Sequence, residues 1–162
     1  MSGVVSFRVR PAGMGDYEAL CPLFDELDAF HREARPDMFQ PFAPPVRPRE
    51  QVARWLAEAG STLLVAESDV GLIGLALLLT RPASPFAGAV PRKVIEIDNL
   101  VVRADQRGQR IGRRLLSESM EWARQRGATH VEVTVHDFNR DAERFYRAFG
   151  FARSMNRLML AA

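Results

Sequence analysis

Hydrophobic and polar residues change their spacing several times along the chain, and each change predicts a separate element. Alternating or continuous apolar runs predict strands at residues 6–10, 62–67, 72–80, 94–102, 130–135 and about 152–160. Apolar residues at helical spacing predict helices at about 16–32, about 49–59, from the turn after the fourth strand to 126, and about 142–149. The order β-α-α-β-β-β-α-β-α-β indicates an α/β fold of the α+β kind. Helices are expected on both faces of a mixed sheet.

Residues 1–162 are expected to form one domain, because a chain of this length with 47% hydrophobic residues can bury one sizeable core. The single cysteine, Cys21, excludes an internal disulfide. No Cys/His cluster has metal-ligand spacing, so no metal is expected. The first ten residues lack a signal-peptide core, and no apolar run approaches the roughly 20 residues that a membrane span needs. We therefore expect a cytoplasmic protein without a membrane partner.

The strand at 94–102 leads through a glycine-bearing turn into an amphipathic helix. A helix start carries unpaired backbone N–H groups and the positive end of the helix dipole, so it binds anions such as phosphates. Gly108 and Gly112 leave room for such a group. A P-loop is excluded because the sole lysine, Lys93, lies upstream, and a dinucleotide turn would need a third glycine.

A second constellation lies about thirty residues downstream, where Asn139, Ala142, Tyr146 and Gly150-Phe151 recur at fixed spacing. A purely structural interpretation makes Asn139 a helix N-cap and Gly150 a C-terminal cap, with the intervening phenylalanines in the core. A cap residue can also contact a ligand, so the structural and functional interpretations are compatible.

These two constellations resemble the signatures of the GNAT-type N-acetyltransferases, and the likeness extends along essentially the whole chain. Residues 107–112 are similar to the family's acyl-CoA turn, in which Arg or Gln is followed by two residues, Gly, one residue, and Gly or Ala. One departure is Arg110, which stands where the family usually has Gly. The resemblance implies a mostly antiparallel sheet and an acyl-CoA cleft where the strand at 94–102 and the following strand splay apart. It also implies acetyl-CoA as cosubstrate and direct attack by a primary amine in a ternary complex.

The resemblance also assigns roles to individual residues. Tyr146 is implied as the acid that protonates the departing thiolate, and backbone N–H groups near Leu100 and Val101 as the oxyanion donors. The implied CoA contacts are Leu100, Val101, Val102, Arg107, Gly108, Gln109, Arg110, Ile111, Gly112, Arg113, Asn139, Ala142 and Tyr146.

The amine must lose a proton, and two carboxylates are candidates for the base. Glu96 and Asp98 lie two residues apart on one strand, so they point to the same face. Burial and a neighbouring carboxylate both raise a carboxyl pKa toward neutrality, which suits a general base. Glu96 is the preferred base because its distance from the turn matches the catalytic glutamate of several family members, and Asp98 is the alternative. The two could instead form ion pairs with arginines such as Arg92 or Arg103.

The net charge of +2 hides an uneven distribution, with acidic residues concentrated at 16–37 and arginines at 103–114. Solvated helix faces would explain this pattern. It would also suit a cationic acceptor at the acidic end and a polyanionic cofactor at the basic end. Acceptor contacts are expected from His31, Phe39 and Phe86. The acceptor is expected to be a small-molecule or peptide amine, and the protein a monomer or homodimer.

Two other functions compete with an N-acetyltransferase. The Arg110 departure suggests a catalytically inactive acyl-CoA-binding module, and the arginine-rich helix suggests a basic nucleic-acid-binding protein. Against the latter, the helix carries Ile111, Leu115, Leu116 and Met120 at core spacing, and no known nucleic-acid motif accompanies it. An enzyme without a nucleic-acid partner is therefore the prediction.

Overall fold

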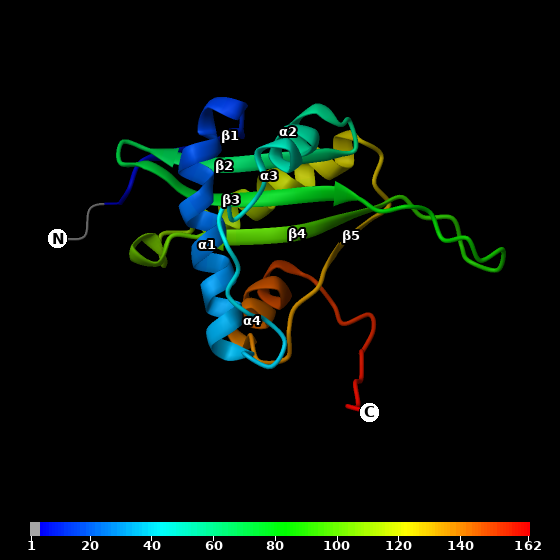
Figure 1. Ribbon diagram of the computed structural model, residues 1–162. Coiled ribbons are helices and arrows are strands. Elements are labelled where there is room, and N and C mark those ends of the chain that lie inside the picture. The colour runs from blue at the N-terminus through cyan, green and yellow to red at the C-terminus, as the bar shows by residue number, and fades with distance from the viewer. Residues whose placement is uncertain (1–3) are drawn as a thin grey trace.

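The computed structural model describes residues 4–162 and contains one five-stranded sheet in the order β1-β2-β3-β4-β5 (Figure 1). The strands are β1 (Phe7–Pro11), β2 (Ser61–Ser68), β3 (Gly71–Thr80), β4 (Val94–Val102) and β5 (His130–Val133). The first four are antiparallel neighbours, and β5 runs parallel to β4. The predicted mixed, mostly antiparallel sheet is confirmed.

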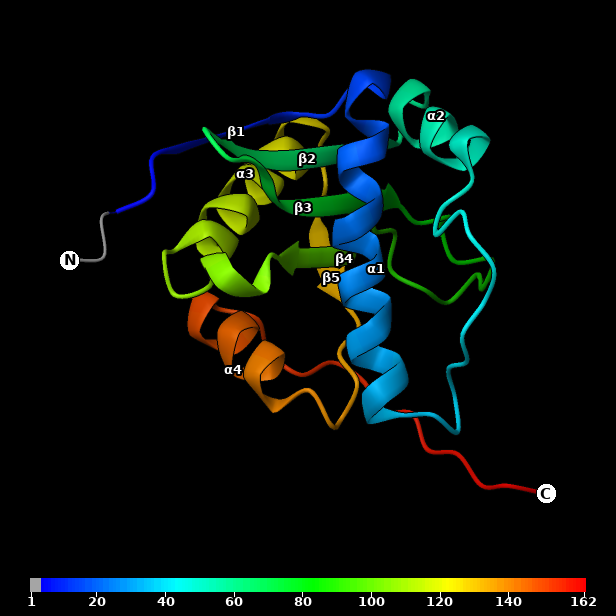
Figure 2. The same cartoon turned by 60° about the vertical axis from the view of Figure 1, so that its left-hand side comes forward.

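Helices cover both faces of this sheet, as predicted. They are α1 (Tyr17–Ala34), α2 (Arg49–Ala57), α3 (Ile111–Gln125) and α4 (Arg140–Phe149), with short 3-10 turns η1 (Met14–Asp16) and η2 (Ala104–Gln106). Alternate residues of β2 enter different cores: Leu63 packs with α1 and α2, and Leu64 with α3. Figure 2 shows α1 in front of the sheet and α3 behind it. None of the helices between residues 4 and 162 combines the length and apolar composition needed to cross a membrane.

A β-bulge in β4 changes which face its side chains occupy. On β3, Leu77 pairs with Asn99 and Leu78 with Ile97, so Asp98 is an extra residue in β4. Ile97 consequently belongs to the core under α3, whereas Val101 belongs to the core under α1. Residues four apart would share one face of a regular strand. The bulge therefore places Asp98 at the point where the strand reorients.

Strands β4 and β5 separate just beyond this bulge. Their parallel pairing runs from Val94 opposite His130 to Ile97 opposite Val133 and then ends. Residues of β4 beyond Ile97 therefore have no strand neighbour on that side, which confirms the predicted opening between the two strands. β4 is the fourth of the five strands, and Asp98 at its bulge is exposed.

The strand predicted at about 152–160 was also wrong. This segment forms no strand and leaves the body of the protein after α4 (Figures 1 and 2). Its apolar residues remain exposed: Met155, Leu158, Met159 and Leu160. Alternating polarity stabilises a strand only when a neighbouring strand and an apolar layer receive it. In this structure the segment packs against neither.

Candidate active site

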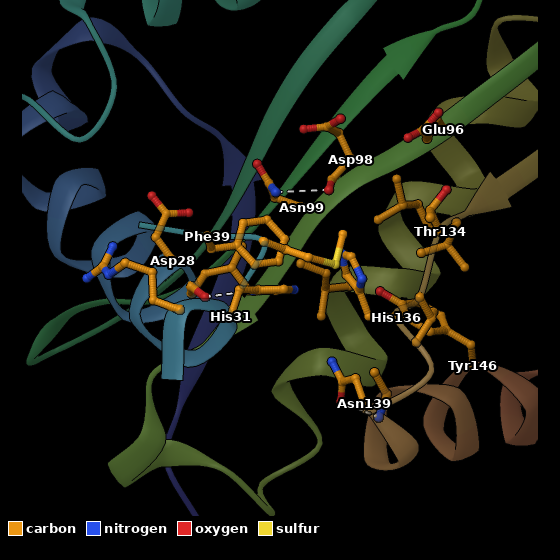
Figure 3. A pocket seen from close by; sticks show the side chains of 18 of the residues that line it. Asp28, His31, Phe39, Glu96, Asp98, Asn99, Thr134, His136, Asn139 and Tyr146 are labelled. Atoms are coloured by element: carbon orange, nitrogen blue, oxygen red, sulfur yellow. Dashed lines mark hydrogen bonds between the residues drawn. The ribbon is translucent and has the colours of Figure 1, made fainter. Parts of the chain in front are cut away.

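A cavity of about 640 Å³ opens where β4 and β5 diverge. Its walls come from the C-terminal half of α1, the loop after it, the β4 bulge, the segment following β5, and the start of α4 (Figure 3). The sequence-predicted residues that line it are His31, Phe39, Glu96, Asp98, Leu100, Asn139, Ala142 and Tyr146. Residues more than a hundred positions apart in the chain therefore meet at one site. Among residues 4–162, no three His, Cys, Asp or Glu side chains are grouped to hold a metal ion.

The two candidate base residues occupy different electrostatic environments. Glu96 forms an ion pair with Arg81, at the end of β3. An arginine partner was anticipated, but neither Arg92 nor Arg103 supplies it. Asp98 makes no salt bridge within the described residues, and partial desolvation at the cavity wall raises its pKa although the residue stays exposed. The neighbouring Glu96 raises that pKa further, whereas Arg81 and Arg47 oppose the shift.

Tyr146 projects from α4 into the cavity with only 7% of its surface exposed. Its ring packs edge-on against Phe145 and Phe151, with centroids 5.1 and 5.5 Å away. Burial raises the pKa of its hydroxyl, so the group stays protonated at neutral pH. That hydroxyl makes no hydrogen bond to any other residue in the part of the chain that the structure describes. It is consequently available to a ligand.

Asn139 caps a helix, as predicted, and also lines the cavity. Its side-chain oxygen accepts a hydrogen bond from the Ala142 backbone N–H at 3.2 Å and caps α4. The same side chain lines the cavity (Figure 3). Gly150 ends the helix with φ +125°, which confirms the predicted C-terminal cap.

The turn before α3 contains two residues with positive φ, a conformation that glycine adopts without strain. Gly108 and Arg110 have φ +79° and +64°, both in the left-handed region. The first N–H groups of any α-helix lack intrahelical partners, and no side chain caps those at the start of α3. The turn keeps the unpaired N–H groups of a helix start although Arg110 is a non-glycine residue in a strained conformation.

We expect Arg110→Gly to stabilise the fold by about 1 kcal/mol, because glycine adopts a positive φ without steric strain. In a thermal melt this corresponds to a rise of about 2–4 °C for a chain of this size. Arg113→Gly is the matched control, since Arg113 lies inside helix α3, where glycine lowers stability. A lower melting temperature for Arg110→Gly would contradict the strain assigned to this turn.

The arginines around the turn are partly engaged within the protein. Arg107 donates to the Val102 carbonyl at 3.2 Å and pairs with Glu26 of α1, also at 3.2 Å. Arg113 lies over the Phe149 ring, 5.6 Å from its centroid. Ile111, Leu115 and Leu116 are buried and pack α3 against the sheet. This confirms the core positions predicted for them from their spacing.

The acidic segment 16–37 does not form the unopposed negative surface that the sequence suggested. Six of its seven acidic residues form salt bridges with arginine: Asp16, Glu18, Asp25, Glu26, Asp28 and Asp37. The partner arginines lie on β1, α1, α2 and the loops, and several of them are distant in sequence from the acidic residue they pair with. Tertiary pairing of this kind cannot be read from local charge counts.

Two of the three predicted acceptor residues line the cavity, and the third does not. His31 and Phe39 face each other there, 5.5 Å apart between ring centroids. The Nδ1–H of His31 donates to the Leu27 carbonyl at 2.8 Å. Phe86 is 72% exposed in the loop between β3 and β4, away from the cavity lining. His136, which follows β5, was not selected from the sequence but lies in the same wall; its position at the end of a strand beside the cleft was the available signal.

Comparison with known proteins defines the class to which this fold and site belong. The sequence model of the acetyltransferase (GNAT) family matches residues 27–151, most of the chain. The protein therefore belongs to the GNAT family of acetyltransferases.

Individual relatives resemble the chain to different extents. The aminoalkylphosphonate N-acetyltransferase of Salmonella typhimurium is 46% identical over 59 residues, 36% of this chain and 38% of that enzyme. The chain thus matches little more than a third of that relative. The uncharacterized N-acetyltransferase YhfO of Bacillus subtilis is 27% identical over 144 residues, 89% of each chain.

Solved structures share the fold over nearly the full length. A tetramutant of the BH1408 protein from Bacillus halodurans has a TM-score of 0.88 at 22% identity, covering 96% of this chain and 99% of that one. The aminoglycoside N-acetyltransferase AAC(6')-Iy, solved in complex with CoA, has a TM-score of 0.71 at 14% identity and covers 96% and 98%.

Proposed function

We propose that this protein transfers the acetyl group of acetyl-CoA to a primary amine by direct attack in a ternary complex. The observation that carries the proposal is one cavity in which Asp98, a carboxylate with no salt bridge among residues 4–162, and a protonated phenol, Tyr146, lie beside the open edge of β4. Amine acetylation needs a proton acceptor on one side of the thioester and a proton donor on the other. This cavity supplies both.

Acetyl-CoA supplies the activated acyl group when it is bound. The start of α3 and the turn from Arg107 to Gly112 would hold its pyrophosphate, because unpaired N–H groups and the helix dipole favour an anion there. The opening between β4 and β5 leaves the backbone of Leu100 and Val101 free of a β5 neighbour, where it can meet the acyl arm and the developing oxyanion. Asn139 and Ala142, at the start of α4, would border the same arm.

Proton movements follow from the two side chains. Asp98 takes a proton from the incoming ammonium, and the neutral amine nitrogen then forms a bond to the acetyl carbonyl carbon. As the carbon–sulfur bond breaks, the Tyr146 hydroxyl gives its proton to the departing sulfur. The new amide nitrogen loses its second proton to the Tyr146 phenolate, which restores the hydroxyl, and Asp98 releases the first proton to solvent. The structure alters the preference between the two carboxylates: Glu96 is held by Arg81, whereas Asp98 is unpaired. We therefore assign the base to Asp98.

An inactive acyl-CoA-binding module is less well supported. That alternative depended on Arg110, yet Arg110 adopts the left-handed conformation that the turn requires. Acetyl-CoA binding and turnover test the two possibilities separately. Calorimetry should show saturable acetyl-CoA binding and a raised melting temperature, and a thiol assay with primary amines should show CoA release. Binding without release on any amine would favour the inactive module, and absence of binding at millimolar acetyl-CoA would contradict both.

Gly112→Asp is expected to weaken acetyl-CoA binding by at least about tenfold. The new carboxylate would stand at the first turn of α3, against the pyrophosphate. A Cβ at this position would meet Phe145 and Val102 only at 3.5 Å or beyond, which is ordinary contact, so the fold should accept the substitution. Gly112→Ala is the matched control and should bind better than the Asp variant. Unchanged affinity in a folded Gly112→Asp protein, measured by calorimetry, would move the pyrophosphate site elsewhere.

A further inference from the structure

Three rings form a continuous aromatic wall in the cavity: those of His31, Phe39 and His136. Each ring meets the other two edge-to-face, with centroid separations of 5.4–5.5 Å. Phe138 stacks behind His136 at 5.4 Å and fixes its plane. In Figure 3 the three rings lie together on the side of the cavity below Asp98. The ring wall, as we call these three residues, joins the end of α1 to the segment after β5.

One of the two imidazoles in the ring wall, that of His136, is shifted toward its neutral form. Burial lowers the pKa of His136, and the positive charges of His31 and Arg35 lower it further, although Asp137 opposes the shift. The His31 Nδ1–H is committed to the Leu27 carbonyl, which fixes the orientation of that ring. The wall therefore presents the ring surfaces of one phenylalanine and two histidines to the cavity.

Negative charge in the cavity is limited to one uncommitted carboxylate. Asp28 is held by both terminal nitrogens of Arg47, at 2.7 and 3.0 Å. Glu96 is held by Arg81. Asp98 alone among the carboxylates that line the cavity has no salt bridge within residues 4–162.

Most carboxylates on the surface leading to the cavity already have arginine partners, Glu33 being the exception within residues 16–37. The acidic residues of α1 and the following loop are almost all paired with arginine. A polyamine or aminoglycoside would have to break these pairs or leave its extra ammonium groups without anionic partners. Either event costs binding free energy.

We infer that the acceptor is a monocationic amine carrying an aromatic group, a class represented by the 2-arylethylamines. This inference rests on the proposed acetyltransferase function. The ammonium group binds Asp98, where it also loses its proton, and the aromatic group packs against the ring wall. Aromatic contacts of this kind add about 0.5–1.5 kcal/mol beyond the area they bury.

The test compares three acceptors by CoA release at saturating acetyl-CoA: 2-phenylethylamine, n-butylamine and kanamycin. We expect kcat/KM for 2-phenylethylamine to exceed that for each of the others by at least about tenfold. A single aromatic contact with its buried area is sufficient for that factor. Equal or greater kcat/KM for kanamycin or butylamine would overturn the acceptor assignment while leaving the acetyltransferase function intact.

Phe39→Leu tests the ring wall itself. It should raise KM for 2-phenylethylamine about tenfold, leave kcat within about twofold, and leave both constants for butylamine nearly unchanged. Phe30→Leu is the control, because Phe30 contacts His31 and Phe138 without lining the cavity. That control should retain the preference for the aromatic amine. Equal losses for both amines in Phe39→Leu would show that the ring only supports the fold, which would contradict the inference.

Direct titration separates this inference from the proposed function. The three amines are titrated calorimetrically into protein saturated with CoA, and 2-phenylethylamine should bind most tightly whether or not turnover occurs. Absence of that preference overturns the acceptor assignment. Failure of the proposed function has a different signature, namely no CoA release with any of the three amines.

Discussion

Asp98→Asn is expected to lower kcat/KM for the amine by about ten- to several-hundredfold, with acetyl-CoA binding unchanged. The amide keeps the size and polarity of the carboxyl group but cannot accept the ammonium proton. The measurement is the initial rate of CoA release at saturating acetyl-CoA over a range of amine concentrations. Glu96→Gln is the matched control: it should lose much less, since the Glu96 carboxylate is already engaged by Arg81. A crippled Glu96→Gln beside an active Asp98→Asn would transfer the base role to Glu96.

The pH profile gives this prediction a definite sign. A carboxylate base works only when ionised, so kcat/KM should fall as pH decreases through the Asp98 pKa. Partial desolvation and Glu96 raise that pKa, so the acidic limb should lie above the ordinary aspartate range, and it should disappear in Asp98→Asn.

Thermal stability should change in the opposite direction from activity. A carboxyl with a raised folded-state pKa contributes less stability once pH rises through that value, so at neutral pH its ionised form destabilises the fold. Asp98→Asn should therefore melt at or slightly above the wild-type temperature. A variant that loses activity because it is less stable would instead have a lower melting temperature than the wild type.

Tyr146→Phe is expected to reduce kcat by about tenfold or more while acetyl-CoA still binds normally. The ring stays packed against Phe145 and Phe151, so the variant should melt within a few degrees of the wild type. The hydroxyl acts mainly in the transition state, when the sulfur gains negative charge, so its loss appears in kcat. Single-turnover rates of CoA release together with calorimetric acetyl-CoA affinity measure both quantities.

A second thioester distinguishes proton donation from positioning. A thioester with a low-pKa thiol needs less help in leaving, so it should recover part of the rate lost in Tyr146→Phe. An equal loss with both thioesters would show that the hydroxyl positions the acyl group without protonating the sulfur. Full activity in the variant would remove Tyr146 from the mechanism.

The elements nearest the site were predictable because their signals are local. The strand, turn and helix from Val94 to Gln125 follow from apolar periodicity and glycine placement. The cap role of Asn139 follows from its position before a helical pattern. These features depend on neighbours in sequence, so the chain itself contains most of the information.

Features that depend on distant partners were harder to predict. Arg81 pairs with Glu96 only because β3 lies beside β4, and no local signal favours Arg81 over Arg92 or Arg103. The strand expected after Phe151 required a neighbouring strand edge that the segment does not reach. His136 joins His31 and Phe39 because the segment after β5 passes the end of α1. Such contacts are set by tertiary packing and have no local signature.

Transfer of a labelled acetyl group tests the central claim most directly. Protein is incubated with acetyl-CoA carrying an isotope in the acetyl group and with 2-phenylethylamine, butylamine and kanamycin in separate reactions. Products are identified by mass spectrometry, and free CoA is quantified. The proposed function predicts label on an amine nitrogen in at least one reaction, with one CoA released per label and little transfer by Asp98→Asn. Unlabelled amines in every reaction, despite folded protein that binds acetyl-CoA, would contradict it.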